Sequence, residues 1–545
     1  KDNTKLNFIL HESAKELEEV ILNYKPSIEI KKDTTTYRVD GFVNGKERKL
    51  KEVLKKLPGV EVDRKGNVFI KDKKVTHVLV EDKTFFNGRT KLAVDNIPAN
   101  VVSEIQMIED YHETSFLKGF KDSGEVVMNI KLKENKKNFI FGDIETGLGV
   151  EDKYRLHPSI FKYNPKMLFN IIGDANNTYS KSFTLSDYMA FEGDNSLENL
   201  LSAFNSNIGK FLQNKDYYKN KHLFGGFNGQ LNPDDKNEIR LFVLGLKDNS
   251  YSQNLDSYVY LANQSFEARQ KDMFKKNGLA IGKLQYKYKP NKNTVLKWEA
   301  TIESNNLNAE NKNASTTVNG TSDYEVENNA DNKTVGIVFK LDKWFSDKNA
   351  STLHFDYTNG KKNQIKEWNS LDNFFSSEIP VINDSFYSVL GLDNIKLNQY
   401  NLALEHFYRP ARVDLLTIGL TQKIYRTRLE ASNQQRTSAN EKINFDGYAN
   451  NLISNFYNTD INLSYKRYFG DLSLSAGLTY NYISWKDIYN DTKPSFDKSN
   501  ILPSVLLEWE FDDRKIFKLA YHKSNIIPTL ENRLYNRKIL DFNRV

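Results

Sequence analysis

The chain of 545 residues contains no cysteine, which excludes disulfide bonds and thiolate metal sites. It also contains no run of 18 uncharged apolar residues, so a transmembrane helix is not expected. The first residues, 1–5, do not form a charged-then-apolar leader, and we expect a mature or trimmed chain. A net charge of +6, with both signs plentiful, is too small to predict nucleic acid as a partner.

Aromatic residues are plentiful: 29 Tyr and 34 Phe stand beside only 5 Met. Together with a low mean hydropathy, this suits a large β-barrel, whose strands are apolar on one face only. A soluble β-protein rich in aromatics would have the same composition. The length exceeds that of a usual single domain, so two or more domains are expected.

The pattern of residues 28–138 predicts a small mixed α/β domain. Leu50, Val53, Leu54 and Leu57 share one face of an amphipathic helix over 47–57, which Pro58-Gly59 ends. The remaining segments read as strands, with His77 as a core or edge residue rather than a ligand. Strands are predicted at 28–30, 35–39, 60–63, 67–70, 75–82, 103–108 and 124–133.

From residue 139 onward the chain predicts about 15 strands of about ten residues, the length a tilted strand needs to cross a bilayer. Short turns alternate with long connections, as in transmembrane barrels with short periplasmic turns and long extracellular loops. Leu472 to Tyr480 alternates apolar with small polar residues, and Trp344 and Tyr465 near strand ends match interfacial aromatic girdles. A soluble β-protein with edge aromatics is the alternative. The long connections are 177–221, 248–278, 304–332, 359–396, 431–454 and 486–499.

Five short motifs occur in the order seen in one kind of plug domain. They are LKKLPGVEV at 54–62, VLVED at 78–82, IPA at 97–99, IQMI at 105–108 and GEVVMNI at 124–130. The sequence therefore resembles a TonB-dependent outer-membrane receptor or transporter, of the type with an upstream carboxypeptidase-regulatory-like domain. One departure is residues 111–120, where the common plug pattern carries a glycine-rich stretch.

The resemblance implies a mainly β fold: a large antiparallel transmembrane β-barrel with an N-terminal mixed α/β plug domain. Such barrels have about 22 strands and a plugged lumen, so about 15 strands imply that the C-terminal part of the barrel is missing. The implied domains are the tail of an upstream β-sandwich (1–16), a TonB box with linker (17–27), the plug (28–138) and the incomplete barrel (139–545).

Two stretches are candidate binding sites. The acidic pair Glu18-Glu19, followed by apolar β-formers, can add as an extended strand to the sheet edge of a partner. Taken alone this stretch also suits an ordinary strand, but the resemblance implies a TonB box made of Leu17, Glu18, Glu19, Val20, Ile21 and Leu22. A plug loop with Phe85, Phe86, Asn87 and Arg89 is a candidate for substrate contact, and a structural turn is the equal alternative.

No catalytic set is present in the sequence. The 8 His show no ligand spacing, and no phosphate loop or nucleophile elbow occurs. The acidic segment 323–331 could hold calcium or be a solvated loop. Lys297 and Glu299, which alternate along a strand, are expected to face the lumen. We therefore expect neither a cofactor, nor a metal, nor an enzyme activity.

The resemblance implies active uptake of a substrate across the bacterial outer membrane, driven through the energy transducer TonB. Outer-membrane lipids are expected partners, and a surface lipoprotein lid or other outer-membrane proteins are further candidates. The alternative is a plug–barrel scaffold subunit of a larger outer-membrane complex, without transport. Oligosaccharide, peptide, siderophore and cobalamin all remain open as substrates.

Overall fold

A computed structural model provides the fold of the chain. It describes residues 26–31, 33–63, 66–70, 73–84, 90, 93–94, 97–111, 125–178, 218–261, 265–318, 320–373, 375, 377–489, 492–512, 515–525, 533–534 and 536–540. Among these residues, no helix has both the length and the apolar character needed to cross a membrane.

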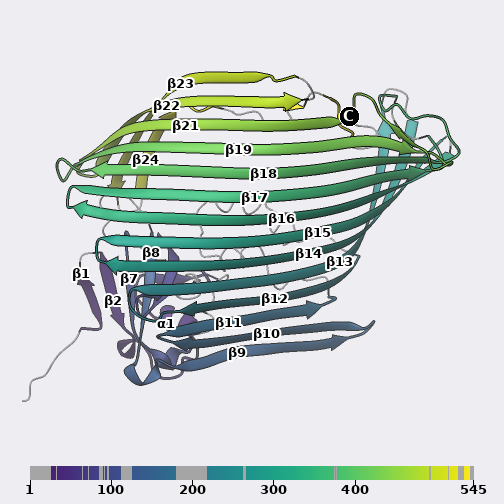
Figure 1. The fold of residues 1–545 in the computed structure, drawn as a ribbon. Coiled ribbons are helices and arrows are strands. Elements are labelled where there is room, and N and C mark those ends of the chain that lie inside the picture. Colours follow the sequence, from purple (N-terminus) through teal and green to yellow (C-terminus); the bar gives the residue numbers. More distant parts are fainter. Residues whose placement is uncertain are drawn as a thin grey trace, which may run out of the picture.

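The N-terminal part is a mixed domain built on one small sheet (Figure 1). Its strand order is β1-β2-β7-β8-β5-β4-β3, with β6 paired to β5, and only the β5–β8 pair is parallel. Each predicted strand of this domain is confirmed within a few residues. The strands are β1 (Ile28–Lys31), β2 (Thr34–Arg38), β3 (Val60–Val62), β4 (Val68–Ile70), β5 (Lys73–Val80), β6 (Lys83–Thr84), β7 (Val102–Ile108) and β8 (Val126–Leu132).

The helix of this domain, α1 (Leu50–Leu54), is shorter than the predicted span 47–57. Before it, the Glu47 carboxylate accepts hydrogen bonds from the backbone N–H groups of Asn44 and Gly45, which belong to a turn. After it, the chain tightens into a turn that ends at Gly59, whose φ of 75° suits glycine. The predicted apolar face is nevertheless correct, because all four of its residues are buried.

The domain has an apolar core with one polar network inside it. Val78, Ile105 and Met128 come from different strands and are fully buried. The buried Asn129 donates hydrogen bonds to Asp82 and to Gln106, both at 2.7 Å. Because the amide is satisfied, its burial costs little and it fixes the register of β8 against its neighbours.

The rest of the chain forms one antiparallel sheet of 16 strands, which curves strongly (Figure 1). Consecutive strands pair throughout, except that the short β20 pairs only with β19. Each strand predicted from residue 139 onward overlaps its own strand of this sheet. The strands are β9 (Phe139–Gly149), β10 (Lys153–Asn164), β11 (Met167–Asn176), β12 (Lys219–Leu231), β13 (Asn237–Tyr260), β14 (Ser265–Asn291), β15 (Thr294–Thr317), β16 (Gly320–Ser346), β17 (Asn349–Ser370), β18 (Tyr387–Tyr408), β19 (Asp414–Arg436), β20 (Lys442–Asn444), β21 (Asn450–Phe469), β22 (Leu472–Tyr489), β23 (Ser495–Asp512) and β24 (Lys515–His522).

The predicted strand length of about ten residues is wrong for much of this sheet. β14 and β16 each have 27 residues, and strands occupy most of the predicted connections 248–278, 304–332, 359–396, 431–454 and 486–499. The segment 323–331, predicted as a loop that could hold calcium, lies inside β16. Apolar alternation marks only the part of a strand with an apolar face, whereas the backbone hydrogen-bond ladder continues through polar sequence.

The two faces of the sheet differ in residue type. Side chains such as Phe224 and Leu244 point inward and pack on the mixed domain, while the alternating Leu223 and Val243 point outward and are exposed. Along β22, as predicted, Leu478 is 50% exposed on the outer face, and the inner positions carry small or polar residues. In the described residues the edge strands β9 and β24 are not paired with each other.

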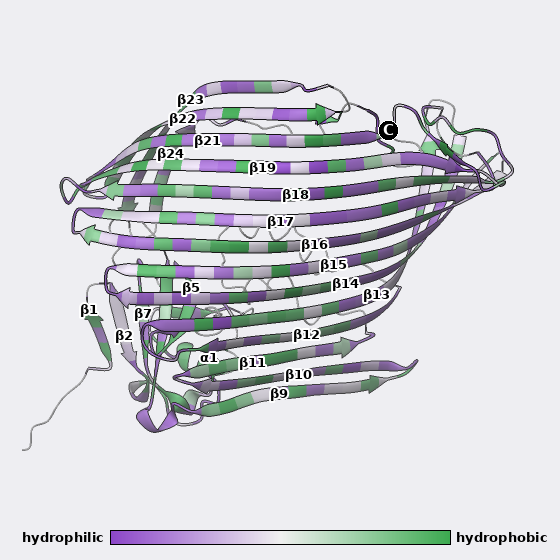
Figure 2. Cartoon of the chain, in the orientation of Figure 1, coloured by the Kyte–Doolittle hydropathy of each residue, from purple (hydrophilic) through white to green (hydrophobic). Residues whose placement is uncertain are grey.

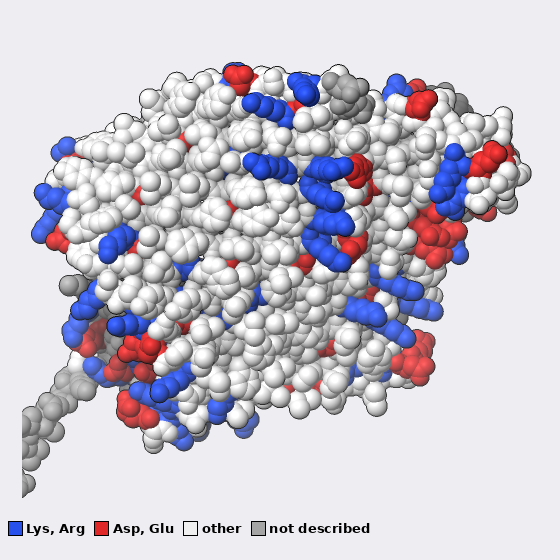
Figure 3. Space-filling view, in the orientation of Figure 1, with Lys and Arg blue, Asp and Glu red and all other residues white. Residues whose placement is uncertain are grey.

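The two ends of the sheet also differ. At the end with tight turns, such as Asn291 to Thr294, hydrophobic and hydrophilic residues alternate (Figure 2). Toward the opposite end, which we call the far end, the strands are mostly hydrophilic (Figure 2). A space-filling view of one face shows a broad surface with few charges, and charged groups gather toward both ends of it (Figure 3).

Candidate functional site

Both predicted binding sites lie outside the described residues. This applies to the proposed TonB box, Leu17 to Leu22, and to the plug-loop residues Phe85, Phe86, Asn87 and Arg89. Their roles stay predictions. Just before the plug loop, Lys83 Nζ donates a 3.1 Å hydrogen bond to the carbonyl of Pro165 in the β10–β11 turn. The base of that loop is thus tied to the sheet.

The mixed domain and the inner wall of β10–β14 share one hydrophobic cluster. Near the tight-turn end the wall contributes stacked aromatic rings: Phe141 lies 4.9 Å from Phe161, and Phe139 lies 5.3 Å from Tyr163. Phe161 and Tyr163 are almost fully buried. Aromatic pairs of this kind stabilise a contact by about 1 kcal/mol beyond their buried area, so they strengthen the pairing of β9 with β10, while the shared hydrophobic cluster holds the mixed domain against this wall.

The same wall also buries polar side chains. Farther along it, Asp174 lies 3.2 Å from His157 and accepts a hydrogen bond from Asn176, and beside the β12–β13 turn Gln230 donates to Asn232 at 3.1 Å. All but His157 are buried. Polar surfaces lose little free energy when they return to water, whereas apolar surface costs about 25 cal/mol per Å². A surface packed against these polar residues would therefore separate from them at lower cost than one packed against the hydrophobic cluster.

The last described residues, 533–534 and 536–540, lie on the inner face of β17–β22 at the far end. Arg533 donates from Nη1 to the buried Asp487 carboxylate at 3.0 Å and to Ser454 Oγ at 2.9 Å. Lys538 pairs with Asp393 at 2.8 Å. Ile539 is buried in a cluster with Trp368 and other residues. Ion pairs and apolar contacts together fix this segment against the wall.

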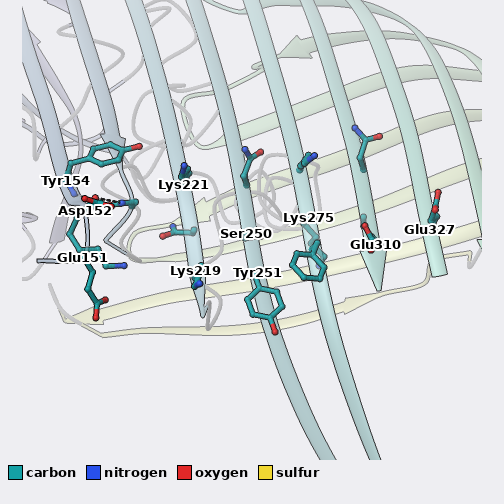
Figure 4. Close-up of a pocket in the computed structure, with 18 of the residues that line it drawn as sticks. Glu151, Asp152, Tyr154, Lys219, Lys221, Ser250, Tyr251, Lys275, Glu310 and Glu327 are labelled. Atoms are coloured by element: carbon teal, nitrogen blue, oxygen red, sulfur yellow. Dashed lines mark hydrogen bonds between the residues drawn. The ribbon is translucent and has the colours of Figure 1, made fainter. Parts of the chain in front are cut away.

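A groove of about 910 Å³ lies at the far end of β12–β16, beside the β9–β10 turn (Figure 4). Most of its lining residues are polar and together they carry both signs of charge, and Tyr251 and Phe274 form a stacked aromatic pair with ring centroids 4.7 Å apart. The charged lining residues are Glu151, Asp152, Lys153, Lys219, Lys221, Lys275, Lys276, Glu310 and Glu327. Such a surface suits a polar solute that offers both hydrogen bonds and an apolar face.

Hydrogen bonds and burial shift the pKa of three carboxylates around the groove. Hydrogen bonds from Gln270 and Tyr251 lower the pKa of Asp272, which therefore stays ionised at neutral pH. A hydrogen bond from Lys312 likewise lowers the pKa of Glu310, while burial raises the pKa of the neighbouring Glu325. Among the described residues, no group of three His, Asp or Glu side chains is placed to hold a metal ion.

Sequence reasoning did not find this groove. Most of its residues were assigned to long connections, where side-chain direction has no periodic signal. The pairing register is what brings them together: Lys276 lies opposite Asn308, which lies opposite Asn329. Lys297 and Glu299 were expected to face the lumen. Glu299 does lie on the inner face, where its Oε1 is 3.3 Å from Lys283 Nζ.

No family model matches the chain, and no curated protein matches it. Among solved structures, it is similar to the siderophore receptor PiuA from Acinetobacter baumannii, with 8% identity over 90% of this chain and 92% of that one and a TM-score of 0.27. BauA, the ferric preacinetobactin receptor of the same organism, gives 9% identity, 89% and 84% coverage and a TM-score of 0.29. The ferric yersiniabactin uptake receptor FyuA from Yersinia pestis gives 10% identity over 91% of this chain and 92% of that one, with a TM-score of 0.18. Likenesses of this size assign neither a family nor a substrate to the chain.

Proposed function

We propose that the protein is an outer-membrane receptor that takes up a polar solute with energy supplied through TonB. The observation that carries this proposal is the distribution of apolar residues on the long sheet. Its outer face is apolar and exposed, whereas its inner face is largely polar except where it packs on a separate folded domain. A protein in water has no reason to place its large apolar side chains this way.

The apolar residues form a belt of limited height. On β15 the outward positions Leu296, Trp298, Ala300 and Ile302 are followed by Ser304, and on β16 Val335 is followed by Lys333. The belt on β15 spans roughly 20 Å along the strand, close to the apolar band of about 25 Å in outer-membrane barrels. The apolar belt thus matches the hydrocarbon core of a bilayer, and a mixed domain inside the barrel wall would close the lumen of the barrel.

The mixed domain must move, in whole or in part, before a large solute can pass. The outer membrane has no nucleotide fuel, so the energy must come from a partner. Leu17 to Leu22 is proposed as the segment that the partner captures by strand addition, which uses backbone hydrogen bonds and alternate side chains.

The test is capture of the full chain from membranes by the periplasmic domain of TonB. Val20→Pro removes a ladder donor and blocks strand pairing, whereas Val20→Thr keeps a β-forming side chain of similar size. We expect the native chain and Val20→Thr to be captured, and Val20→Pro to lose at least about 90% of capture, a tenfold change that corresponds to about 1.4 kcal/mol.

Equal capture of all three chains would contradict the proposed box. If no chain is captured, and the same set of outer-membrane proteins or lipoproteins co-purifies with each of them, the chain is a scaffold subunit and not a transporter. Uptake of candidate solutes by cells carrying Val20→Thr and Val20→Pro then separates active transport from binding alone.

A further inference from the structure

Four basic side chains form a straight row across the outer face of β16, β17, β18 and β19. Lys333 lies opposite Lys361, Lys361 opposite Lys396, and Lys396 opposite Arg428. All four are exposed, and a column of basic groups crosses this face in the space-filling view (Figure 3). We call these residues the basic row.

Such a row is unfavourable on its own. Like charges directly opposite each other in an antiparallel sheet destabilise the pairing. At its two ends the row is neutralised, because Asp331 lies 3.4 Å from Lys333 and Glu430 lies 2.6 Å from Arg428.

The middle of the row is not neutralised. There, the positions that match Asp331 and Glu430 on β17 and β18 are Asn363 and Asn394, which are uncharged. Within the described part of the chain, Lys361 and Lys396 make no ion pair. The centre of the row therefore presents uncompensated positive charge.

The row lies just beyond the apolar belt. Toward the belt, Tyr357 and Tyr400 contact each other with ring centroids 4.9 Å apart, as the aromatic girdle of a barrel would. Between them and the row, Asn359 donates a 2.9 Å hydrogen bond to Asn398. From Tyr357 to Lys361 the strand rises roughly 13 Å, so the row stands at the level where lipid headgroups begin.

We propose that the basic row binds the phosphate groups of anionic lipid headgroups in the outward-facing leaflet. Because adjacent strands are about 4.8 Å apart, the row is roughly 14 Å wide and can contact more than one phosphate of the same lipid. The lipid chains would lie on the belt beneath it. This inference rests on the membrane placement of the proposed function, but it requires neither TonB nor transport.

The experiment uses the full chain in nanodiscs of phosphatidylcholine with lipid A, a glycolipid that carries two phosphates, as the probe. The double variant Lys361→Gln/Lys396→Gln removes the unpaired charges, and Lys292→Gln/Lys348→Gln removes two exposed lysines away from the row as a control. At about 1 kcal/mol for each basic residue near a lipid surface, we expect the row variant to bind lipid A about 10- to 30-fold more weakly. The control should bind it as the native chain does, and salt should weaken the native binding.

A second measurement separates binding from a structural role. In neutral detergent, without lipid A, the row variant should melt at a higher temperature than the native chain, because the like-charge repulsion is gone. A lower melting temperature together with unchanged lipid binding would overturn the proposal. Inorganic phosphate that fully displaces lipid A would also overturn it, in favour of a soluble anion. A native chain that fails to enter nanodiscs would overturn this inference and the proposed function together.

Discussion

The mixed domain and the long sheet place their apolar residues in opposite ways. In the mixed domain, Val78, Ile105 and Met128 are fully buried, and polar side chains face the water. In the long sheet, Leu478 and Ile461 are about half exposed on the outside, while Ser473 and Asn481 are buried on the inside. The two regions obey the same rule, that apolar surface avoids water, but in different surroundings. A residue's exposure therefore has to be judged against the solvent its face meets.

The largest expected effect comes from a charge inside the mixed domain. Ile105→Asp would bury an unpaired carboxylate in a core position and should destabilise this domain by about 4 kcal/mol or more. The long sheet should persist. Trypsin digestion in detergent checks this: the mixed domain should be cleaved rapidly while the large fragment survives. If both regions are cleaved together, they fold as one unit and the contrast between them is weaker than described.

A charge on the outer belt should act through the membrane. Leu478→Arg places a cation on the outer face of β22 and should cost about 2–4 kcal/mol in a bilayer, whereas Ser475→Arg on the inner face should be tolerated. Folding into lipid vesicles, followed by urea titration, measures the difference. Equal effects of the two substitutions would contradict the assignment of the faces.

A smaller effect is expected at the far end of the inner face. Asp487→Asn weakens the buried pair with Arg533 and should loosen the segment 533–540 by about 1.5–3 kcal/mol. Cleavage by trypsin at Arg537 and Lys538 should accelerate. The exposed Asp497→Asn is the matched control and should leave the rate unchanged.

The smallest effect concerns the turn between β17 and β18. Hydrogen bonds from the side chain and backbone of Ser438 lower the pKa of Asp384 below its usual value of 3.8. Because the folded-state pKa is lowered, the contact is fully present above that value and is lost as the pH falls through the lowered pKa. Cleavage in this turn by an acid protease should rise at low pH in the native chain. The Asp384→Asn chain should be cleaved at a rate that does not follow the titration of this carboxylate. The same pH dependence in both chains would exclude Asp384 as its cause.

The sequence predicts the order and position of the strands well. Each strand of the long sheet contains a stretch such as Leu472 to Tyr480, in which period-two alternation is strong enough to stand alone. The small domain follows for the same reason, since its strands are short, apolar and separated by clear turn residues. The helix was overextended, because its predicted start at Glu47 serves a turn instead.

Strand length and the candidate sites were much less predictable. Beyond the belt, both faces of β15 and β16 are polar, so hydrophobic alternation disappears although the pairing continues to Thr317 and Gly320. The groove and the basic row exist only through register, which relates residues far apart in sequence. Lys333 and Lys361 become neighbours only when β16 is aligned with β17, and no local sequence pattern predicts this alignment.

Because the β15–β16 hairpin is long, its tip is expected to stand well outside the surface of a cell that carries this protein. From Ser304 to the turn after Thr317, the polar part of β15 extends roughly 45 Å along the strand beyond the belt. With a strand tilt of about 40°, the turn would stand roughly 35 Å above the membrane. Antibodies, phages and proteases would meet this hairpin before any lipid, and an epitope inserted after Val318 should be stained on intact cells.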